Sequence, residues 1–478
     1  MAKTLHKATP TVLMAGRTTA AAALAQHVLA IRPDDEKAQA AYANATDQLA
    51  VVASGWPDVP ARKPAYEPRT DAVLSVLAQS LPIQSGGYAT RSHGVLTGLA
   101  ACGWDVDAVT RLGFPYDRWN GADPREVPPS DTVDGITYHR ILERGERAYP
   151  QYPLASYIQR FSQQVERHAR THRAALIHAS SFHVNGLAGS AAARRLGMPF
   201  LYEMRGLEDL MKISRDPSFA ETDRYRFTTM LEYESCLRAD KVFVITEALR
   251  REMADRGVPD DRMVVLPNGV HVDRFMPRPR DPELEAELGV AGKTVIGYAG
   301  GLVDYEGLDL LLEAVAALKE RRSDFHLVVV GDGHYQRTVL ATASRLRLDD
   351  VVTFTGRVPH EEVGRYISLF DVAPFPRLPL PVCELISPIK PFESMAMGKA
   401  VVVSSVAALI EIVQDGTTGL VFDKGDATDL AAVLERLIDS PDLRSSLGTA
   451  AREWVIAERD WSSIVKTVDA TYREVLEG

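Results

Sequence analysis

The sequence predicts an α/β protein with two doubly wound parallel-sheet domains and a helical extension before them. The first observation is that short β-rich apolar runs alternate with amphipathic helical patterns between residues 72 and 405, which is typical of parallel sheets covered on both faces. The second is that these runs are too numerous for one doubly wound sheet. The third is an ordinary globular composition, with 46% hydrophobic and 25% charged residues over 478 positions, enough chain for about two to three domains.

The N-terminal extension covers residues 1–69. Between residues 12 and 55 apolar positions recur three and four apart and are interrupted at Pro33, so two helices joined by a turn are expected. The pattern resembles one helix-turn-helix unit of the tetratricopeptide kind, without a second unit at a fixed period. A docking arm and a helical hairpin packed on the main body are both open interpretations. The Pro-rich stretch Gly55–Arg69 lacks apolar periodicity and predicts a linker.

The apolar runs divide the remaining chain into two domains, residues 70–265 and 266–455, with a helix expected at 456–478. In the first domain, strands are expected at Ala72–Leu77, Asp105–Thr110, 175–180, 199–204, 241–246 and 263–268. In the second, strands are expected at 294–300, 326–333, 351–356, 371–376 and 400–405. Ligands of such sheets bind beyond the carboxyl ends of the strands, so polar residues that follow these runs are the candidates for function.

Composition and charge argue against several classes of protein. The net charge of −10 disfavours nucleic-acid binding. The three cysteines are far apart and odd in number, which disfavours a disulfide framework and suits a reducing cytoplasm. No apolar run approaches the roughly 18 residues of a transmembrane segment, and no signal peptide is expected. The basic segment Arg167–Arg173 is compatible with peripheral membrane contact and with a solvated helix. The sequence does not define the oligomeric state.

The loop after the first predicted strand, PIQSGGYATRSHG, combines glycines with polar residues. Gly86 and Gly87 permit a positive φ and a close approach of a ligand to the backbone. The helix expected from Tyr88 would direct its N-terminus at that ligand, which suits an anion or a polar sugar. Arg91 and His93 lie in its first turns. A tight strand–helix turn without a ligand is the structural alternative.

Polar residues also follow two later strands of the first domain. His178 lies at the end of the run 175–180, and His183 lies in the loop beyond it. Glu203 and Arg205, in YEMRG, would orient either a substrate or each other. The structural alternatives are a buried, hydrogen-bonded histidine and an internal ion pair.

Two pairs of residues have a metal-like spacing, but we predict no metal site. His168 and His172 are four apart on an expected helix, without an HExxH pattern or a third ligand. Asp105 and Asp107 form a DxD pattern at the entry of a strand, which is the wrong end for a ligand cleft.

The stretch SPIKPFESMAMGKAVVVS, Ser387–Ser404, carries the most specific signal. Pro388 and Pro391 are expected to hold Lys390 in an extended loop. Glu393 then falls in the first turn of a helix, where a carboxylate suits the positive end of the helix dipole. A lysine at a helix N-terminus suits a pyrophosphate, and a carboxylate beside it suits ribose hydroxyls. The stretch therefore predicts a site for a nucleotide diphosphate.

This stretch, together with GDGHY, FTGRVPHEEV, LPNGV and EIVQDGTTGLVFDKGD, is similar to the family 4 glycosyltransferases over about residues 70–475. The resemblance implies the GT-B fold, in which two Rossmann-like domains face a central cleft and the final helix crosses back to the N-terminal domain. It implies an N-terminal acceptor domain and a C-terminal sugar-nucleotide domain. The implied reaction is a retaining transfer from a UDP- or GDP-sugar, without metal or cofactor.

The resemblance also implies roles for individual residues. Glu393 resembles the ribose-binding carboxylate, and Lys390 and Arg357 resemble contacts to the phosphates or the base. The expected catalytic residues are Lys390, His178 and Arg205. The expected substrate-binding residues are Gly86, Gly87, Arg91, His93, Ser180, Gly300, Gly301, Arg357, Leu385, Ser387, Ile389 and Glu393.

Three features depart from the family pattern, all at the donor end of the site. The family's second glutamate falls on Leu385. Its phosphate-binding arginine and lysine fall on Gly301 and Glu306, and its second histidine of the HxH stretch falls on Ser180. These departures predict an unusual donor sugar or a changed donor geometry, with Lys390 carrying more of the phosphate charge.

We therefore expect a cytoplasmic glycosyltransferase that moves a sugar from a UDP- or GDP-sugar to a small metabolite or a glycan. One specific alternative is an S-glycosyltransferase of a lincosamide-type antibiotic pathway, which joins a GDP-octose to a thiol. A second is a catalytically impaired GT-B-fold binding or scaffold protein. A third is an epimerase or phosphorylase on the same fold.

Overall fold

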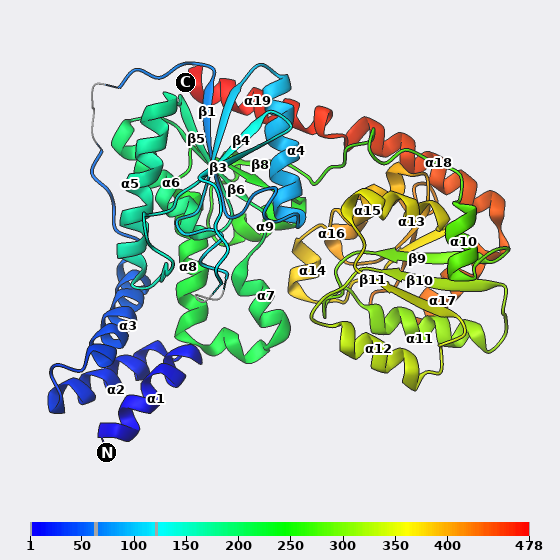
Figure 1. Ribbon diagram of the computed structural model, residues 1–478, viewed down its shortest axis with the longest axis horizontal. Helices are drawn as coiled ribbons and strands as arrows, with labels where there is room; N and C mark the ends of the chain where they lie inside the picture. Colours follow the sequence, from blue (N-terminus) through cyan, green and yellow to red (C-terminus); the bar gives the residue numbers. More distant parts are fainter. Residues whose placement is uncertain (1, 62–65, 120–122, 478) are drawn as a thin grey trace. The chain divides into compact units, whose positions relative to one another are not determined.

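A computed structural model describes residues 2–61, 66–119 and 123–477 (Figure 1). The chain divides into two compact units. Unit 1 extends to Ile245 and includes Leu249–Leu266 and the chain from Val465, and unit 2 comprises Thr246–Ala248 and Pro267–Ile464. The main division, after Leu266, lies one residue from the predicted boundary. Within the described residues, no helix combines the length and the apolar character that crossing a membrane requires.

Unit 1 is built on a sheet with the strand order β3-β4-β2-β1-β5-β6-β7-β8, parallel except for the β3–β4 pair. The strands are β1 (Ala72–Leu77), β2 (Asp105–Thr110), β3 (Ser130–Val133), β4 (Ile136–Arg140), β5 (Leu176–Ser180), β6 (Phe200–Met204), β7 (Lys241–Val244) and β8 (Met263–Val265). The helices of its α/β body are α4 (Gly87–Ala101), α5 (Leu154–His172), α6 (His183–Leu196), α7 (Glu208–Arg215), α8 (Asp223–Leu237), α9 (Glu247–Asp255) and α19 (Trp461–Glu477). Every residue of β1, β5 and β6 is buried, as parallel strands covered on both faces require.

The N-terminal extension is part of unit 1 and has three helices, α1 (Ala2–Met14), α2 (Thr18–Ile31) and α3 (Glu36–Ser54). The sequence predicted only the last two. The carboxylate of Asp47, on α3, accepts the N–H of Leu154 at the start of α5 (3.1 Å). The N–H of Thr19 donates to the Asp223 carboxylate at the start of α8 (2.8 Å). These contacts favour a hairpin packed on the main body over a free docking arm.

Unit 2 has a parallel sheet with the strand order β11-β10-β9-β12-β13-β14. Its strands are β9 (Thr294–Ala299), β10 (Phe325–Val330), β11 (Val352–Gly356), β12 (Val372–Phe375), β13 (Ala400–Ser404) and β14 (Leu420–Phe422). Its helices are α10 (Pro282–Leu288), α11 (Leu308–Lys319), α12 (Gln336–Arg345), α13 (Val363–Leu369), α14 (Pro381–Leu385), α15 (Lys390–Ala396), α16 (Ala407–Ile410), α17 (Ala427–Asp439) and α18 (Pro441–Glu458). Helices lie on both faces of the sheet (Figure 1). The chain runs outward from β9 to β11 and then returns beside β9 as β12, so the strand order reverses between β9 and β12.

Candidate active site

Three charged side chains of unit 2 meet beyond the ends of its two central strands. β9 ends at Ala299 and β12 ends at Phe375, on either side of the point where the strand order reverses. In doubly wound sheets this point is where ligands bind. The segment after β9 carries Glu306, and the segment after β12 carries Arg377 and leads to Lys390. This group is the candidate active site of unit 2.

Lys390 is the centre of the group. Its Nζ lies 3.2 Å from Oε1 of Glu306 and donates a hydrogen bond of 2.8 Å to the hydroxyl of Tyr298. The ammonium group also lies 5.1 Å from the centroid of the Tyr298 ring, within the range of a cation–π contact. The side chain is 22% exposed, so a ligand can reach a cation that is already held in place.

Glu306 joins Lys390 to a second cation that the sequence analysis missed. Nε of Arg377 lies 3.7 Å from Oε1 of Glu306, and both side chains are buried. Burial alone would raise the pKa of Glu306, but Lys390 and Arg377 outweigh it and lower that pKa. One carboxylate therefore faces two cations, and the group keeps a surplus positive charge that suits an anionic ligand. The signal for Arg377 was its place directly after a predicted strand.

Gly300 and Gly301 differ in the space that surrounds a β-carbon built at each position. A β-carbon on Gly300 would lie 2.3 Å from Cε of Lys390, so only glycine leaves room for the lysine there. A β-carbon on Gly301 would meet only the carbonyl oxygen of Asp332, at 3.9 Å. The Gly301 carbonyl accepts the hydroxyl of Tyr298 (3.0 Å). The lysine, the tyrosine and the glycine loop are thus connected by hydrogen bonds.

Glu393 lies one turn beyond Lys390 on α15. This helix begins at Lys390, and Ile389 before it already has helical backbone angles (φ −84°, ψ −31°). The expectation of an extended loop around Lys390 is therefore wrong, because the proline at the second helical position is compatible with the first turn of a helix. Glu393 is in the first turn, as predicted. Burial raises the pKa of Glu393 to about 7, against the opposing charge of Lys390.

The residues that precede α15 have mainly backbone contacts. Leu385 ends α14, and Ser387 is buried. Glu384 lies beside the position of the family's second glutamate, and its carboxylate accepts two hydrogen bonds within the protein. Its Oε2 accepts the N–H of Ala407 (2.8 Å), and its Oε1 accepts Nζ of Lys424 (2.6 Å). Its two oxygens therefore already have partners.

Arg357 lies apart from the Lys390 group. It is exposed and follows β11, which is separated from β9 by β10. Its expected contact with phosphate or base stays a prediction.

Unit 1 holds a second charged network, built around Glu203 at the end of β6. Nε of Arg91 donates to its Oε1 (2.6 Å), and a guanidinium nitrogen of Arg205 donates to its Oε2. Ser180 Oγ donates to the same Oε2 at 3.3 Å, and Nε2 of His178 lies 3.6 Å from it. All five residues are buried. Burial would raise the pKa of Glu203, but the two arginines outweigh it and hold the pKa far below its usual range.

The proposed catalytic residues His178 and Arg205 both belong to this network, although Nε2 of His178 and Nε of Arg205 are buried without a hydrogen-bond partner among the described residues. Nδ1 of His178 lies 2.6 Å from the hydroxyl of Tyr472 on α19. Burial lowers the pKa of His178 to about 4, so the ring is neutral at pH 7. NH1 of Arg205 donates to Ser92 Oγ (2.6 Å) and to the Tyr88 carbonyl (3.0 Å). The structure shows an internal ion network, and the catalytic roles stay predictions.

The glycine loop of unit 1 differs from its prediction. Gly86 precedes α4 with φ −77°, and Gly87 is the first residue of the helix. Gly86 therefore does not use the positive φ that a glycine permits. Its backbone is extended, as a helix N-cap requires. His93 is hydrogen bonded to the hydroxyl of Tyr138 (2.8 Å) and to the carboxylate of Asp134 (2.9 Å). Arg91 and His93 thus face different partners.

The metal-like pairs form ordinary polar contacts. Nε2 of His139 lies 2.9 Å from the Asp107 carboxylate, and its ring lies 5.5 Å from that of His168. Nε2 of His172 lies 3.1 Å from the carbonyl oxygen of Asp105. Among the described residues, no group of three or more histidine, cysteine or acidic side chains is arranged to hold a metal ion.

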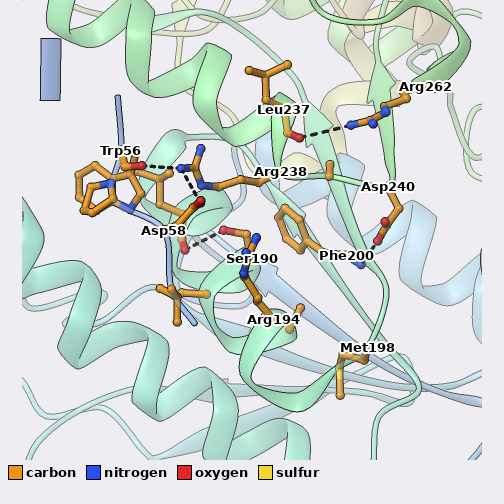
Figure 2. A pocket seen from close by; sticks show the side chains of 16 residues that line it. Trp56, Asp58, Ser190, Arg194, Met198, Phe200, Leu237, Arg238, Asp240 and Arg262 are labelled. Carbon is orange, nitrogen blue, oxygen red and sulfur yellow. Dashed lines mark hydrogen bonds and ion pairs between the residues drawn. The ribbon is translucent and has the colours of Figure 1, made fainter. Parts of the chain in front are cut away.

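A cavity of about 510 Å³ lies elsewhere in unit 1 (Figure 2). It is lined by the linker residues 56–59, by residues of α6, and by residues at or before the starts of β6, β7 and β8, the edge opposite the carboxyl ends of those strands. NH2 of Arg238 donates to the carbonyl of Trp56 (2.5 Å), and NH1 of Arg262 donates to the carbonyl of Leu237, the last residue of α8 (3.4 Å). Arg238 thus holds the linker, and Arg262 binds a carbonyl at the end of α8. Both contacts are structural.

Two family models match the chain. The model described as "Glycosyl transferase 4-like domain" matches residues 86–269, and the model described as "Glycosyl transferases group 1" matches residues 281–454. Residues 1–85, which include the helical extension, lie outside both matches.

Individual proteins with similar sequences or folds are consistent with these family matches. The chain is 28% identical over 376 residues to a D-inositol 3-phosphate glycosyltransferase of Arthrobacter sp. (strain FB24), covering 77% of this chain and 85% of that one. It is 31% identical over 248 residues to a GDP-mannose-dependent alpha-(1-6)-phosphatidylinositol monomannoside mannosyltransferase of Mycolicibacterium smegmatis, covering 50% and 63%. Its fold resembles sucrose-phosphate synthase from Thermosynechococcus elongatus, with a TM-score of 0.70 at 23% identity over 85% of this chain and 99% of that one.

The chain belongs to the glycosyltransferases of the family 4 type. Its fold is GT-B, with two parallel-sheet α/β units. The expected family, fold class and enzyme class are thereby confirmed.

Proposed function

We propose that this protein is a metal-independent, retaining glycosyltransferase of the cytoplasm that transfers a sugar from a UDP- or GDP-sugar to an acceptor. The observation that carries the proposal is the position of Lys390, whose ammonium group is held at the strand-order reversal of unit 2 by Glu306 and Tyr298. This is the place where a doubly wound sheet binds a nucleotide.

The lysine supplies the charge that the reaction requires. When the bond between the sugar and the diphosphate breaks, negative charge accumulates on the phosphate oxygens. A cation held beforehand in a partly buried site stabilises that charge without reorganising. Arg377 adds to the positive potential, although its own side chain is buried. In this proposal Lys390 fills the role that a divalent cation has in metal-dependent transferases.

Different relatives support the proposed donor base and the proposed acceptor. The relative named as GDP-mannose-dependent supports a guanine nucleotide, whereas a UDP-sugar remains the alternative donor. The relative named for D-inositol 3-phosphate supports a small metabolite as acceptor. The relative named for phosphatidylinositol monomannoside supports a glycolipid. The S-glycosyltransferase and the scaffold protein stay alternatives that turnover measurements distinguish.

Calorimetric titration with UDP and with GDP tests the donor site directly. We expect one of the two nucleotides to bind the wild-type protein and to bind more weakly to Glu393→Ala. The nucleotide that binds then selects the sugar nucleotides for an acceptor screen, and NMR of the product's anomeric proton reports retention or inversion. If neither UDP nor GDP binds, the proposal of a donor site at Lys390 fails.

Gly300→Ala is expected to weaken binding of the donor nucleotide about ten- to a hundredfold, because the new methyl group would displace the Lys390 side chain. Calorimetric titration of the wild type and the variant measures the change. An affinity of Gly300→Ala within about twofold of wild type would mean that Lys390 does not contact the nucleotide.

Donor affinity is expected to rise with pH between about 6 and 8. The pKa of Glu393 is raised to about 7 in the free protein, and ribose hydroxyls donate best to the ionised carboxylate. Binding should therefore lower this pKa, so the complex gains affinity as the carboxylate loses its proton. The measurement uses an intact sugar nucleotide, whose diphosphate does not titrate in this range. Glu393→Gln should show a flat profile, and a persistent slope would assign the pH dependence to another group.

A further inference from the structure

The Leu385–Ser387 segment, which begins at the last residue of α14 and precedes α15, is held by three side chains, one on each of three consecutive carbonyls. Thr246 Oγ1 donates to the carbonyl of Leu385 (2.7 Å). A guanidinium nitrogen of Arg377 donates to the carbonyl of Ile386. Asn268 Nδ2 donates to the carbonyl of Ser387 (2.7 Å). Lys390 lies three residues beyond Ser387.

The segment depends on these donors because it has no regular structure of its own. It lies between two short helices and pairs with no strand. Pro388 has no N–H to donate. Ser387 is buried, and Leu385 and Ile386 are half-buried. Backbone carbonyls that are shielded from water need partners, and here side chains supply them. The donors are themselves buried, with Thr246 2% exposed and Asn268 5% exposed.

Two of the three donors come from the points where the chain passes between the units. Thr246 follows Ile245, the last residue of the first segment of unit 1, and Asn268 lies two residues beyond Leu266, after which the long segment of unit 2 begins. Neither residue lies near Lys390 in the sequence. Each is separated from the carbonyl that it holds by more than a hundred residues, 139 for Thr246 and 119 for Asn268.

We infer that Thr246 and Asn268 are positioning residues, which hold the Leu385–Ser387 segment and thereby set where Lys390 meets the diphosphate of the donor. The inference rests on the proposed function, since it assigns Lys390 to the phosphates. Neither side chain touches the ligand. Each acts through a backbone carbonyl, so its effect is confined to the part of the nucleotide that Lys390 contacts.

The experiment compares nucleoside diphosphate with nucleoside in calorimetric competition, using whichever base the wild-type protein binds. Thr246→Val and Asn268→Leu each remove one hydrogen-bond donor and keep the side-chain volume nearly unchanged. We expect each to weaken the diphosphate about fivefold and to leave nucleoside affinity unchanged. Thr246→Ser keeps the hydroxyl and should restore wild-type affinity. Thr418→Val is the matched control, because it removes another buried hydroxyl of unit 2, which accepts the N–H of Gln414 (2.9 Å).

A double variant of Thr246→Val and Lys390→Met distinguishes positioning of the lysine from a general loss of structure. If Thr246 acts through the lysine, Thr246→Val should not weaken the diphosphate further in the Lys390→Met background. Equal losses for diphosphate and nucleoside, or additive losses in the double variant, would overturn the inference. If Lys390→Met alone weakens the diphosphate while Thr246→Val and Asn268→Leu do not, the inference fails and the proposed function stands. If the wild-type protein binds neither nucleotide, both fail.

Discussion

Replacement of Lys390 by methionine is expected to lower the turnover of the donor sugar nucleotide by at least about a hundredfold. The variant removes the ammonium group that lies 3.2 Å from Glu306 Oε1 and 2.8 Å from the Tyr298 hydroxyl. It keeps an unbranched side chain of similar length, so the space beside Gly300 stays filled. The loss should appear in both KM and kcat, because the lysine binds the diphosphate and also stabilises the negative charge that develops as the bond to the leaving group breaks. Steady-state assays with donor and acceptor measure this directly.

Lys424→Met provides the control for removal of a lysine from unit 2. Nζ of Lys424 donates to Glu384 at 2.6 Å, and its side chain is 39% exposed. Turnover should stay within about threefold of wild type, since an exposed ion pair of this kind contributes little. Near-normal turnover of Lys390→Met would remove the lysine from the mechanism and leave Arg377 as the remaining cation of the group.

Most of the fold could be predicted because buried parallel strands leave a simple pattern in the sequence. The predicted strands at Ala72–Leu77 and Asp105–Thr110 match β1 and β2 residue for residue. The hairpin of β3 and β4 was missed, since its strands are short and only partly apolar. Its turn did carry a signal. Asp134 and Gly135 both have positive φ (48° and 82°), and Asp-Gly is a preferred pair for such a two-residue turn.

The candidate site of unit 2 could be predicted only in part. Lys390 and Glu393 were accessible because they share one local motif. The partner of Lys390 could not be predicted, because Glu306 is far away in the sequence. The sequence identified Glu306 only as the position where the family has a phosphate-binding lysine. The structure shows that the carboxylate holds the lysine of another segment. Contacts of this kind depend on the order of strands in the sheet, which local patterns do not encode.

In unit 1, local patterns identified polar residues but could not identify their partners. Polar residues at strand ends predicted a site at His178 and Arg205, and the structure joins them to a common buried carboxylate. The partner of His178 Nδ1 is Tyr472, which lies 294 positions away on the last helix. Sequence patterns predicted that these residues lie at or just beyond the carboxyl ends of their strands, and the structure places them there. They could not tell whether the polar groups there serve a ligand or one another.

Glu203→Gln is expected to lower the free energy of unfolding of unit 1 by about 3–5 kcal/mol, because it leaves Arg91 and Arg205 buried without a compensating charge. Urea denaturation followed by circular dichroism measures this loss. The pKa of Glu203 lies well below its usual range, so its stabilising effect is complete above the unfolded-state pKa, about 4.3. It is lost only as the pH falls below that value toward the folded-state pKa. The difference between wild type and variant should therefore be constant from pH 5 to pH 8 and shrink in more acidic solution.

Glu126→Gln is the control within the same unit. Oε1 of Glu126 lies 3.5 Å from NH2 of Arg147, and the glutamate side chain is 86% exposed, so its loss should cost less than about 1 kcal/mol. A similarly small cost for Glu203→Gln would mean that the two arginines find other partners, and that the buried network tolerates change. That outcome would favour a role in binding for this cluster, since a network that rearranges at little cost is one that a ligand could also enter.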